Sequence, residues 1–171
     1  MAFLYEIFLS FNDAAESKNM DFKFLPSVAS YKMFIDKGYL DKVTYNLLSN
    51  AFKYTPSGGK VTFSVTVDEA KKQLVISVAD SGVGIPKEKR NELFKRFMQS
   101  SFSGSSVGVG LHLTHELVCV HKGTIVYTEN EGGGSIFTVS LPTDISVYEE
   151  KDFLIPHNVL LEEEEVHHAA V

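Results

Sequence analysis

The apolar positions of the chain follow helical spacing in several stretches. The first stretch predicts one amphipathic helix that ends near residue 19, because its apolar side chains share a face: Leu4, Ile7, Phe8, Phe11 and Ala15. A second helix is predicted over residues 38–54 by the apolar set Leu40, Val43, Leu47, Leu48 and Ala51. Pro86 favours the first turn of a helix that runs to about residue 98. A last helix is predicted over residues 111–121, with Gly123 just beyond its end.

Between these helices lie segments with the patterns of strands. Phe22 and Phe24 alternate with charged residues until Pro26, as in a half-buried strand. Two hairpins follow, each made of two segments rich in Val, Ile, Thr and Phe: residues 61–67 with 73–79, and residues 124–128 with 135–141. Hairpins favour antiparallel pairing, and helices that are apolar on one face cover one side of a sheet. We therefore predict a two-layer α/β sandwich, whose mixed, mostly antiparallel sheet carries helices on one face.

Two stretches lack such patterns. Residues 99–110 contain five serine and three glycine residues, which predicts a flexible loop. After Pro142 the chain carries four consecutive glutamates, residues 162–165, and few apolar repeats. This composition predicts an acidic linker or tail over residues 143–171.

Composition narrows the function classes. The 171 residues suffice for one domain with a sizeable core. The formal net charge is −6 and the basic residues are scattered, so we expect no nucleic-acid partner. Cys119 is the single cysteine, which rules out a disulfide within the chain and suits a reducing cytosol; its valine neighbours predict a buried position. No apolar run approaches the ~20 residues that span a bilayer.

The helix over residues 38–54 carries a polar face. Asn46, Asn50 and Lys53 recur at positions i, i+4 and i+7, so their side chains can converge. Asparagine is mildly unfavourable inside a helix, which indicates a ligand. Asparagine carbonyl oxygens suit Mg²⁺, and lysine suits phosphate. The alternative is a solvated polar face.

Two glycine motifs offer further candidate sites. Asp80 follows a predicted strand, where a carboxylate can accept a hydrogen bond from an exocyclic amine, and Gly82 and Gly84 let the backbone approach a flat ring. Gly108 and Gly110 open the last helix, whose N-terminal amides can bind anions. No Lys-Ser or Lys-Thr pair follows, so this is not a P-loop. Taken singly, each motif is equally consistent with an ordinary turn or helix start.

Two aromatic residues, Phe94 and Phe97, precede the predicted loop. Aromatic residues three positions apart on a helix usually pack in a core, and Phe97 is also placed to anchor the base of a lid.

In this order and spacing, the elements resemble one superfamily, the ATPase fold shared by sensor histidine kinases, DNA gyrase and heat-shock chaperone ATPases. The resemblance covers residues 39–142 and is carried by the Asn box, the first Gly box, the Phe box, the second Gly box and the closing hairpin: residues 46–56, 80–85, 94–97, 108–111 and 132–142. It implies a Bergerat-type ATPase fold and the ATP-binding catalytic domain of a bacterial sensor histidine kinase.

The resemblance also implies residue roles. Asn50 would hold Mg²⁺ with Asn46 in support, Lys53 would contact phosphate, Tyr54 would cover the adenine, and Asp80 would accept from the adenine amino group. Further nucleotide-binding positions follow from the same boxes: Gly82, Gly84, Ile85, Phe97, Gly108, Val109, Gly110, Leu111 and Thr138. Residues 99–107 would form a lid over ATP.

The implied reaction transfers the γ-phosphoryl group of ATP to a histidine on a dimerisation domain, which we expect to lie outside this chain. None of the six histidines has the required setting: His112, His115, His121, His157, His167 and His168. Residues 1–19 would end a dimerisation helix, residues 20–142 would form the catalytic domain, and residues 143–171 the linker or tail. The implied whole protein is a homodimeric inner-membrane sensor with a cytoplasmic kinase part. Its partner would be a response regulator or a receiver domain.

Residues 114–118 are similar to hybrid sensor kinases of Bacteroides-type gut bacteria, in which a receiver domain follows the kinase. Two positions depart from the family pattern. Val107 replaces a hydroxyl-bearing residue, and Gln99 stands where many members have arginine. These departures leave open a nucleotide-binding module that regulates a partner without catalysis. A serine kinase of the anti-sigma type is a further alternative, against which the N-terminal helix weighs. Chaperone-type ATPases place a water-activating glutamate where Asn46 stands, so its absence favours a kinase over a hydrolase.

Overall fold

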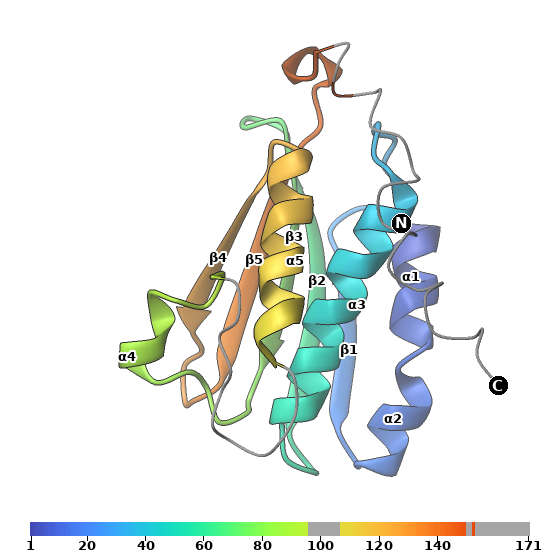
Figure 1. Ribbon diagram of the computed structural model, residues 1–171. Helices are drawn as coiled ribbons and strands as arrows, with labels where there is room; N and C mark the ends of the chain where they lie inside the picture. Colours follow the sequence, from blue (N-terminus) through green and yellow to red (C-terminus); the bar gives the residue numbers. More distant parts are fainter. Residues whose placement is uncertain (96–106, 150–151, 153–171) are drawn as a thin grey trace, which may run out of the picture.

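The computed structural model describes residues 1–95, 107–149 and 152, and its centre is a five-stranded sheet (Figure 1). The strands are β1 (Asp21–Pro26), β2 (Lys60–Asp68), β3 (Gln73–Asp80), β4 (Thr124–Glu129) and β5 (Ser135–Pro142), in the spatial order β1-β2-β3-β5-β4. Strand β1 runs parallel to β2, and all other pairs are antiparallel. The predicted mixed, mostly antiparallel sheet is confirmed.

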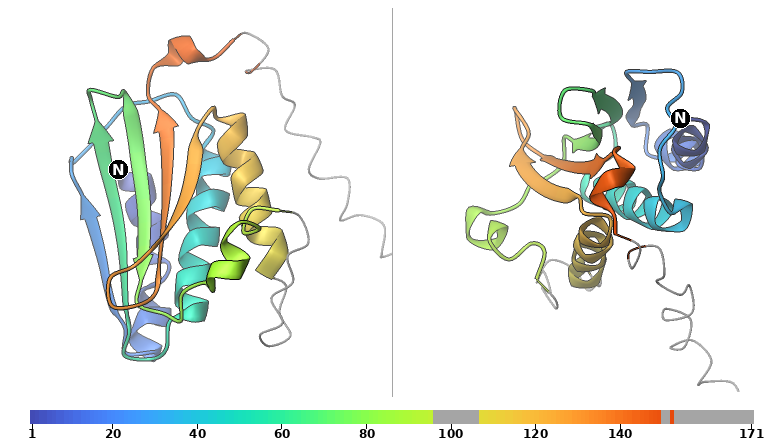
Figure 2. Two further views of the ribbon diagram at one scale, coloured as in Figure 1. Left: turned by 90° about the vertical axis from the view of Figure 1, so that its left-hand side faces the viewer. Right: turned by 90° about the horizontal axis from the view of Figure 1, so that it is seen from above.

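The helices make the second layer. They are α1 (Ala2–Leu9), α2 (Asn12–Ser17), α3 (Lys37–Tyr54), α4 (Lys87–Arg90) and α5 (Val107–Val120), followed by the short 3-10 helix η1 (Ile145–Val147). Helices α1, α3 and α5 lie on the same face of the sheet, whereas α4 lies to one side, near β4 (Figures 1 and 2). This arrangement confirms the predicted two-layer α/β sandwich.

Alternation along the strands decides which side chains meet the helices. On β3 the odd positions are half-buried, and every second residue from Leu74 to Asp80 is buried. The buried residues of the strands pack with the apolar stripe of α3 in one core that includes Phe63, Ile76, Val139, Leu47 and Leu48. The opposite face of the sheet includes several serine and threonine residues at half-buried positions, so hydrophobic burial fixes the register of the strands.

The N-terminal segment differs from the prediction of a single helix, because it is divided into α1 and α2. At the break, the Ser10 hydroxyl donates to the carbonyl oxygen of Ile7 at 2.6 Å, and the Phe11 amide bonds to Phe8, three residues back. Side-chain bonds of serine to the backbone compete with helical bonds, which accounts for the interruption. Leu4, Ile7, Phe11 and Ala15 are nevertheless buried as the pattern predicted.

Helix α4 is also shorter than predicted and ends at Arg90 rather than near residue 98. The next amide bonds join Leu93 to Arg90 and Lys95 to Glu92, both spanning three residues. Leu93 is buried in the core, so the chain tightens into turns that carry this side chain inward. Conversely, α5 begins at Val107, four residues before the predicted start, while residues 99–106 of the predicted loop lie outside the described part.

Three further observations concern the expected surface features. Cys119 is exposed on α5, so the prediction of a buried cysteine is wrong. The start of the predicted tail packs back on the domain, because the Tyr148 hydroxyl donates to the carbonyl oxygen of His121. No helix in the described part of the chain is long and apolar enough to cross a membrane.

Candidate functional site

One end of the sheet gathers most of the sequence-predicted residues. The C-terminal end of α3, the start of α5, the end of β3 and the β4–β5 connection meet there, at the bottom of Figure 1. Helix α3 begins at the other end, where the Asp36 carboxylate caps it by accepting from the Gly38 and Tyr39 amides. The length and direction of α3 therefore carry its polar face to the end where Asp80 lies.

Asn46 joins α3 to α5. Its side-chain amide donates to the hydroxyl of Thr114 at 2.6 Å, and that hydroxyl donates to the carbonyl oxygen of Gly110 at 2.9 Å. Thr114 is almost fully buried, so its hydroxyl is satisfied on both sides within the helix pair. The structure thus couples the Asn box to the second Gly box through a residue that the sequence did not single out.

Gly110 is required by the same contact. A Cβ atom at this position would overlap the side-chain oxygen of Asn46. The sequence indicated that Gly110 lets the backbone approach a phosphate, and the structure gives it a packing role as well. Only glycine lets α3 and α5 approach this closely without moving Asn46.

Asn50 and Tyr54 hold polar groups that have no hydrogen-bond partner among the described residues. The Asn50 amide nitrogen and the Tyr54 hydroxyl are buried and make no hydrogen bond to any described residue. A buried polar group without a partner destabilises the fold by about 1–3 kcal/mol. A ligand that supplied a partner would offset this cost. Lys53, between them in sequence, is exposed, and its ammonium lies 5.4 Å from the centre of the Tyr54 ring.

Asp80 ends β3 on the helix-covered face and is 4% exposed. Its Oδ1 atom accepts from the amide of Gly82 at 2.8 Å and from the amide of Ser135 at 3.2 Å. Burial raises the pKa of the Asp80 carboxyl, and the two amide bonds act in the opposite direction. Both amide bonds go to Oδ1, so the backbone orients the carboxylate at this oxygen.

The β4–β5 connection holds the backbone at Asp80. The Asn130 side chain donates to the Asp80 carbonyl oxygen at 2.8 Å. Gly134 has a φ of +101°, and a Cβ there would overlap the same carbonyl oxygen. Gly84, in turn, lies against Gly134. The two glycine-containing loops therefore form one wall beside the carboxylate.

The loop after Asp80 also contacts the end of α3, because the Val83 amide donates to the Tyr54 carbonyl oxygen at 3.3 Å. The structure thus brings together residues predicted from three separate motifs: Asn46, Asn50, Lys53, Tyr54, Asp80, Gly82, Gly84 and Gly110.

The other candidates divide into three groups. Thr138 is not brought to this end of the covered face: its hydroxyl pairs with that of Ser77 at 3.4 Å on the opposite face of the sheet. Phe97 lies outside the described residues, whereas Gly108 and Val109 are described only as backbone in the first turn of α5. Leu111 is buried in the core, and Ile85 is partly buried and packs against the core.

Thr114, Asn130 and Ser135 are the site residues that sequence reasoning missed. Ser135 had a detectable signal, because it is the first residue after three consecutive glycines and so follows a tight turn into β5. Thr114 and Asn130 lie in ordinary helical and turn contexts, so nothing local distinguishes them.

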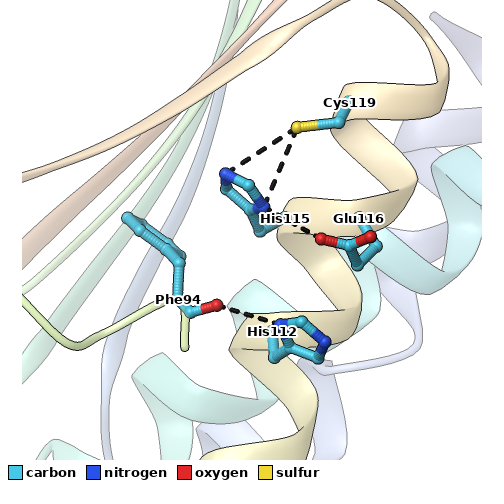
Figure 3. A network of polar contacts seen from close by, with 5 residues as sticks. All are labelled: Phe94, His112, His115, Glu116 and Cys119. Carbon is cyan, nitrogen blue, oxygen red and sulfur yellow. Dashed lines mark hydrogen bonds and ion pairs between the residues drawn. The ribbon is translucent and has the colours of Figure 1, made fainter. Parts of the chain in front are cut away.

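The Phe box contacts α5 through two histidines (Figure 3). The His112 Nδ1 atom donates to the carbonyl oxygen of Phe94 at 3.0 Å, and the His115 ring stacks on the Phe94 ring with centroids 5.6 Å apart. Glu116 and Cys119 complete this surface cluster, with Cys119 Sγ 3.7 Å from His115 Nε2. No group of three or more metal-binding side chains is found among the residues that the structure describes.

The arrangement can recognise a ligand with two different ends. Asp80 offers an oriented acceptor for an amine, while Asn50, Lys53 and the first turn of α5 offer amide, ammonium and helix N-terminal groups. Ammonium groups and helix N-termini attract anions such as phosphate. A purine nucleotide combines both features.

Comparison with known proteins agrees with this chemistry. Residues 35–145 match the family model of histidine kinase-, DNA gyrase B- and HSP90-like ATPases. Histidine kinase P4 of Formosa agariphila is 38% identical over 148 residues, which cover 82% of this chain and 11% of that protein. This chain therefore spans about a tenth of the length of that relative.

Solved structures agree on the fold. The nucleotide-free catalytic domain of histidine kinase ThkA superposes with a TM-score of 0.75 at 24% identity, covering 83% of this chain and 91% of that one. ThkA in complex with the response regulator TrrA gives a TM-score of 0.72 at 23% identity, covering 84% of this chain and 40% of that one.

Proposed function

This chain belongs to the family of histidine kinase-, DNA gyrase B- and HSP90-like ATPases, as a catalytic domain of histidine kinase type, and on this premise we propose its reaction. The domain binds ATP and transfers the γ-phosphoryl group to a histidine that a dimerisation domain presents. The observation that carries the nucleotide assignment is the buried Asp80 carboxylate, oriented at Oδ1 by two backbone amides.

The nucleotide would lie between Asp80 and α3. Asp80 would accept from the adenine amino group, and the loop containing Gly82, Gly84 and Ile85 would line the base. Tyr54, whose buried hydroxyl has no partner among the described residues, would cover the ring. Lys53, exposed at the end of α3, would contact the phosphates. The backbone of Gly108 and Val109 at the start of α5 would add N-terminal amides.

Mg²⁺ fits the residues present. The Asn50 amide nitrogen has no hydrogen-bond partner among the described residues, and the side chain also carries a hard carbonyl oxygen, which suits Mg²⁺. Mg²⁺ usually keeps several waters and takes only one or two protein ligands beside substrate phosphates, and here Asn50 would be the protein ligand. When bound, the ion neutralises charge on the phosphates. Asn46 would support Asn50 indirectly, since its own side-chain amide already donates to Thr114.

The protein's contribution to the reaction is positioning. Phosphoryl transfer requires the attacking and leaving atoms to lie in line, and most of the catalytic effect comes from orientation and charge stabilisation. The nucleophile belongs to the acceptor histidine, so no general base is needed beside ATP. Asn46 stands where hydrolytic relatives place a glutamate, and it donates to Thr114 instead of activating water.

The partners are part of the same proposal. The acceptor would be a His-bearing dimerisation domain, and the phosphoryl group would pass on to a response regulator or receiver domain. The response regulator bound to ThkA supports this class of partner. We further propose that residues 1–19 end the dimerisation helix, residues 20–142 form the catalytic domain and residues 143–171 form a linker. The whole protein would be a homodimeric inner-membrane sensor with this domain in the cytoplasm.

Transfer in trans tests the proposal. The chain is incubated with radiolabelled ATP, with and without a separate His-bearing histidine kinase dimerisation domain. We expect slow labelling of that domain only, as acid-labile and base-stable phosphohistidine, because a bimolecular encounter loses most of the advantage of proximity. Asn50→Ala should abolish the label. Label on this chain alone would show that the acceptor is misidentified. ATP binding without any transfer would favour a regulatory nucleotide-binding module.

A further inference from the structure

Arg90 makes contacts that nucleotide binding as described does not use. It is the last residue of α4, and its side chain is 26% exposed. Its Nε donates to the carbonyl oxygen of Ile85 at 2.9 Å. One terminal nitrogen lies 3.0 Å from the Glu129 carboxylate, and the guanidinium carbon lies 5.4 Å from the centre of the Tyr127 ring. One side chain thus contacts three separate residues.

These contacts join two loops that lie far apart in the sequence. Ile85 ends the glycine loop that begins after Asp80. Glu129 ends β4 and immediately precedes the turn that contains Asn130 and Gly134. At the inner side, the two loops already meet through Asn130, Gly134 and the Asp80 carbonyl oxygen. Arg90 connects their outer ends, so the wall beside the Asp80 carboxylate is fixed from both sides.

Arginine suits this task because of its shape. The guanidinium is planar, presents several donors in a rigid fork and stacks on aromatic rings, so it can donate to a carbonyl and a carboxylate while covering Tyr127. The Tyr127 ring is itself held against Phe137, with ring centroids 5.5 Å apart, and its hydroxyl is buried. The aromatic contact of Arg90 is therefore a half-buried ring that packs against the core.

We infer that Arg90 is a positioning residue for adenine nucleotides: it holds the loop of residues 82–85 against β4 and so fixes the pocket wall beside Asp80. This inference rests on the proposed function, because the loop matters only if a base binds beside Asp80. Arg90 acts through the Ile85 carbonyl and the Glu129 carboxylate and has no contact with the ligand itself.

Calorimetric titration of the chain with ADP, ATP and adenosine tests the inference. Arg90→Ala should weaken all three by a similar factor, about five- to tenfold, because residues in one hydrogen-bonded network couple at this level. Glu129→Gln should give a smaller loss of the same kind. Arg90→Lys should recover little, since one ammonium cannot reproduce the fork. Lys71→Ala is the matched control: it breaks an exposed ion pair with Asp68 at the β2–β3 connection and should leave every affinity unchanged.

The outcomes separate the two proposals. If the unmodified chain binds no adenine nucleotide, the proposed function fails and the role of Arg90 falls with it. If the unmodified chain binds adenine nucleotides, and the folded Arg90→Ala and Glu129→Gln variants bind them with the same affinity, only the positioning role is overturned. A loss for ATP and ADP with unchanged adenosine affinity would reveal a direct phosphate contact and would also overturn it. Thermal unfolding of each variant shows that the affinities compare folded proteins.

Discussion

The Asn46 side-chain amide and the Thr114 hydroxyl lie 2.6 Å apart, and this hydrogen bond ties α3 to α5 at the candidate nucleotide site. The two residues are 68 positions apart in the sequence. We therefore expect the packing of α3 on α5 to depend on this partly buried polar pair.

Thr114→Val should remove this bond while conserving volume. Asn46 would then have a partly buried amide without its partner, and unfolding in urea should become easier by about 1–3 kcal/mol. Thr138→Val is the control, because its hydroxyl makes only a 3.4 Å contact with Ser77 on the open face. Its effect should stay within about 0.5 kcal/mol. Equal effects of the two substitutions would show that the Asn46 bond contributes nothing.

Gly110→Ala should destabilise the fold although alanine favours helices. The new methyl group overlaps the Asn46 side-chain oxygen, and overpacking of this kind costs about 1–3 kcal/mol. In an Asn46→Ala background the overlap is gone, so the same Gly110→Ala change should stabilise by up to ~1 kcal/mol, the helix propensity difference. A double-mutant cycle by urea unfolding measures this reversal of sign. Additive effects would contradict the steric explanation.

Asp80→Asn should weaken adenine nucleotides. The amide oxygen can still accept from the Gly82 and Ser135 amides, but the amide nitrogen would turn a donor toward the adenine amine. Loss of a hydrogen bond to a charged group costs about 1.5–3 kcal/mol, which is roughly tenfold or more in affinity. Calorimetry with ADP measures the change, and Asp68→Asn in the exposed β2–β3 connection is the control. Unchanged affinity in a folded Asp80→Asn protein would exclude Asp80 as the base-recognition residue.

The buried Asp80 carboxyl should also leave a pH signature on stability. Its pKa is raised above the ordinary value of 3.8, so the folded state favours its protonated form. Its contribution to the free energy of unfolding is greatest below 3.8, falls as pH rises through the native pKa and is constant above it. The Asp80→Asn variant has no carboxyl at this position and so lacks this pH-dependent contribution. The stability of the variant relative to the unmodified chain should therefore rise across this pH window, as urea unfolding at a series of pH values would show. A pH-independent difference would contradict the raised pKa.

Asn50→Ala should separate metal dependence from base binding. ATP should bind the unmodified chain more tightly with Mg²⁺ than with a chelator, because the Asn50 carbonyl suits the ion. The substitution should remove most of this difference while leaving adenosine affinity nearly unchanged. Calorimetry of both ligands in both conditions provides the internal control. Equal ATP affinity with Mg²⁺ and with chelator in the unmodified chain would exclude Asn50 as a metal ligand.

Local patterns in the sequence were enough to predict the layers. The Val, Ile, Thr and Phe content of residues 61–67 and 73–79 indicated the strands, and the apolar stripe of residues 38–54 indicated the buried helix face. Burial is the dominant force that places these elements. Helix ends were predicted less well. The break at Ser10 and the end of α4 at Arg90 depend on individual hydrogen bonds and on the inward turn of Leu93, which periodicity does not describe.

The sequence by itself determined that Asn46, Asn50 and Lys53 share a helix face and that a carboxylate follows a buried strand, because helix and strand periods are local properties. Only the tertiary structure decided what these residues meet. Thr114 on Asn46, Ser135 on Asp80 and Glu129 on Arg90 are contacts between distant segments, and they depend on how α3, α5 and the β4–β5 connection pack together. The same packing placed Thr138 on the opposite face, because β5 alternates sides and its buried positions are odd-numbered.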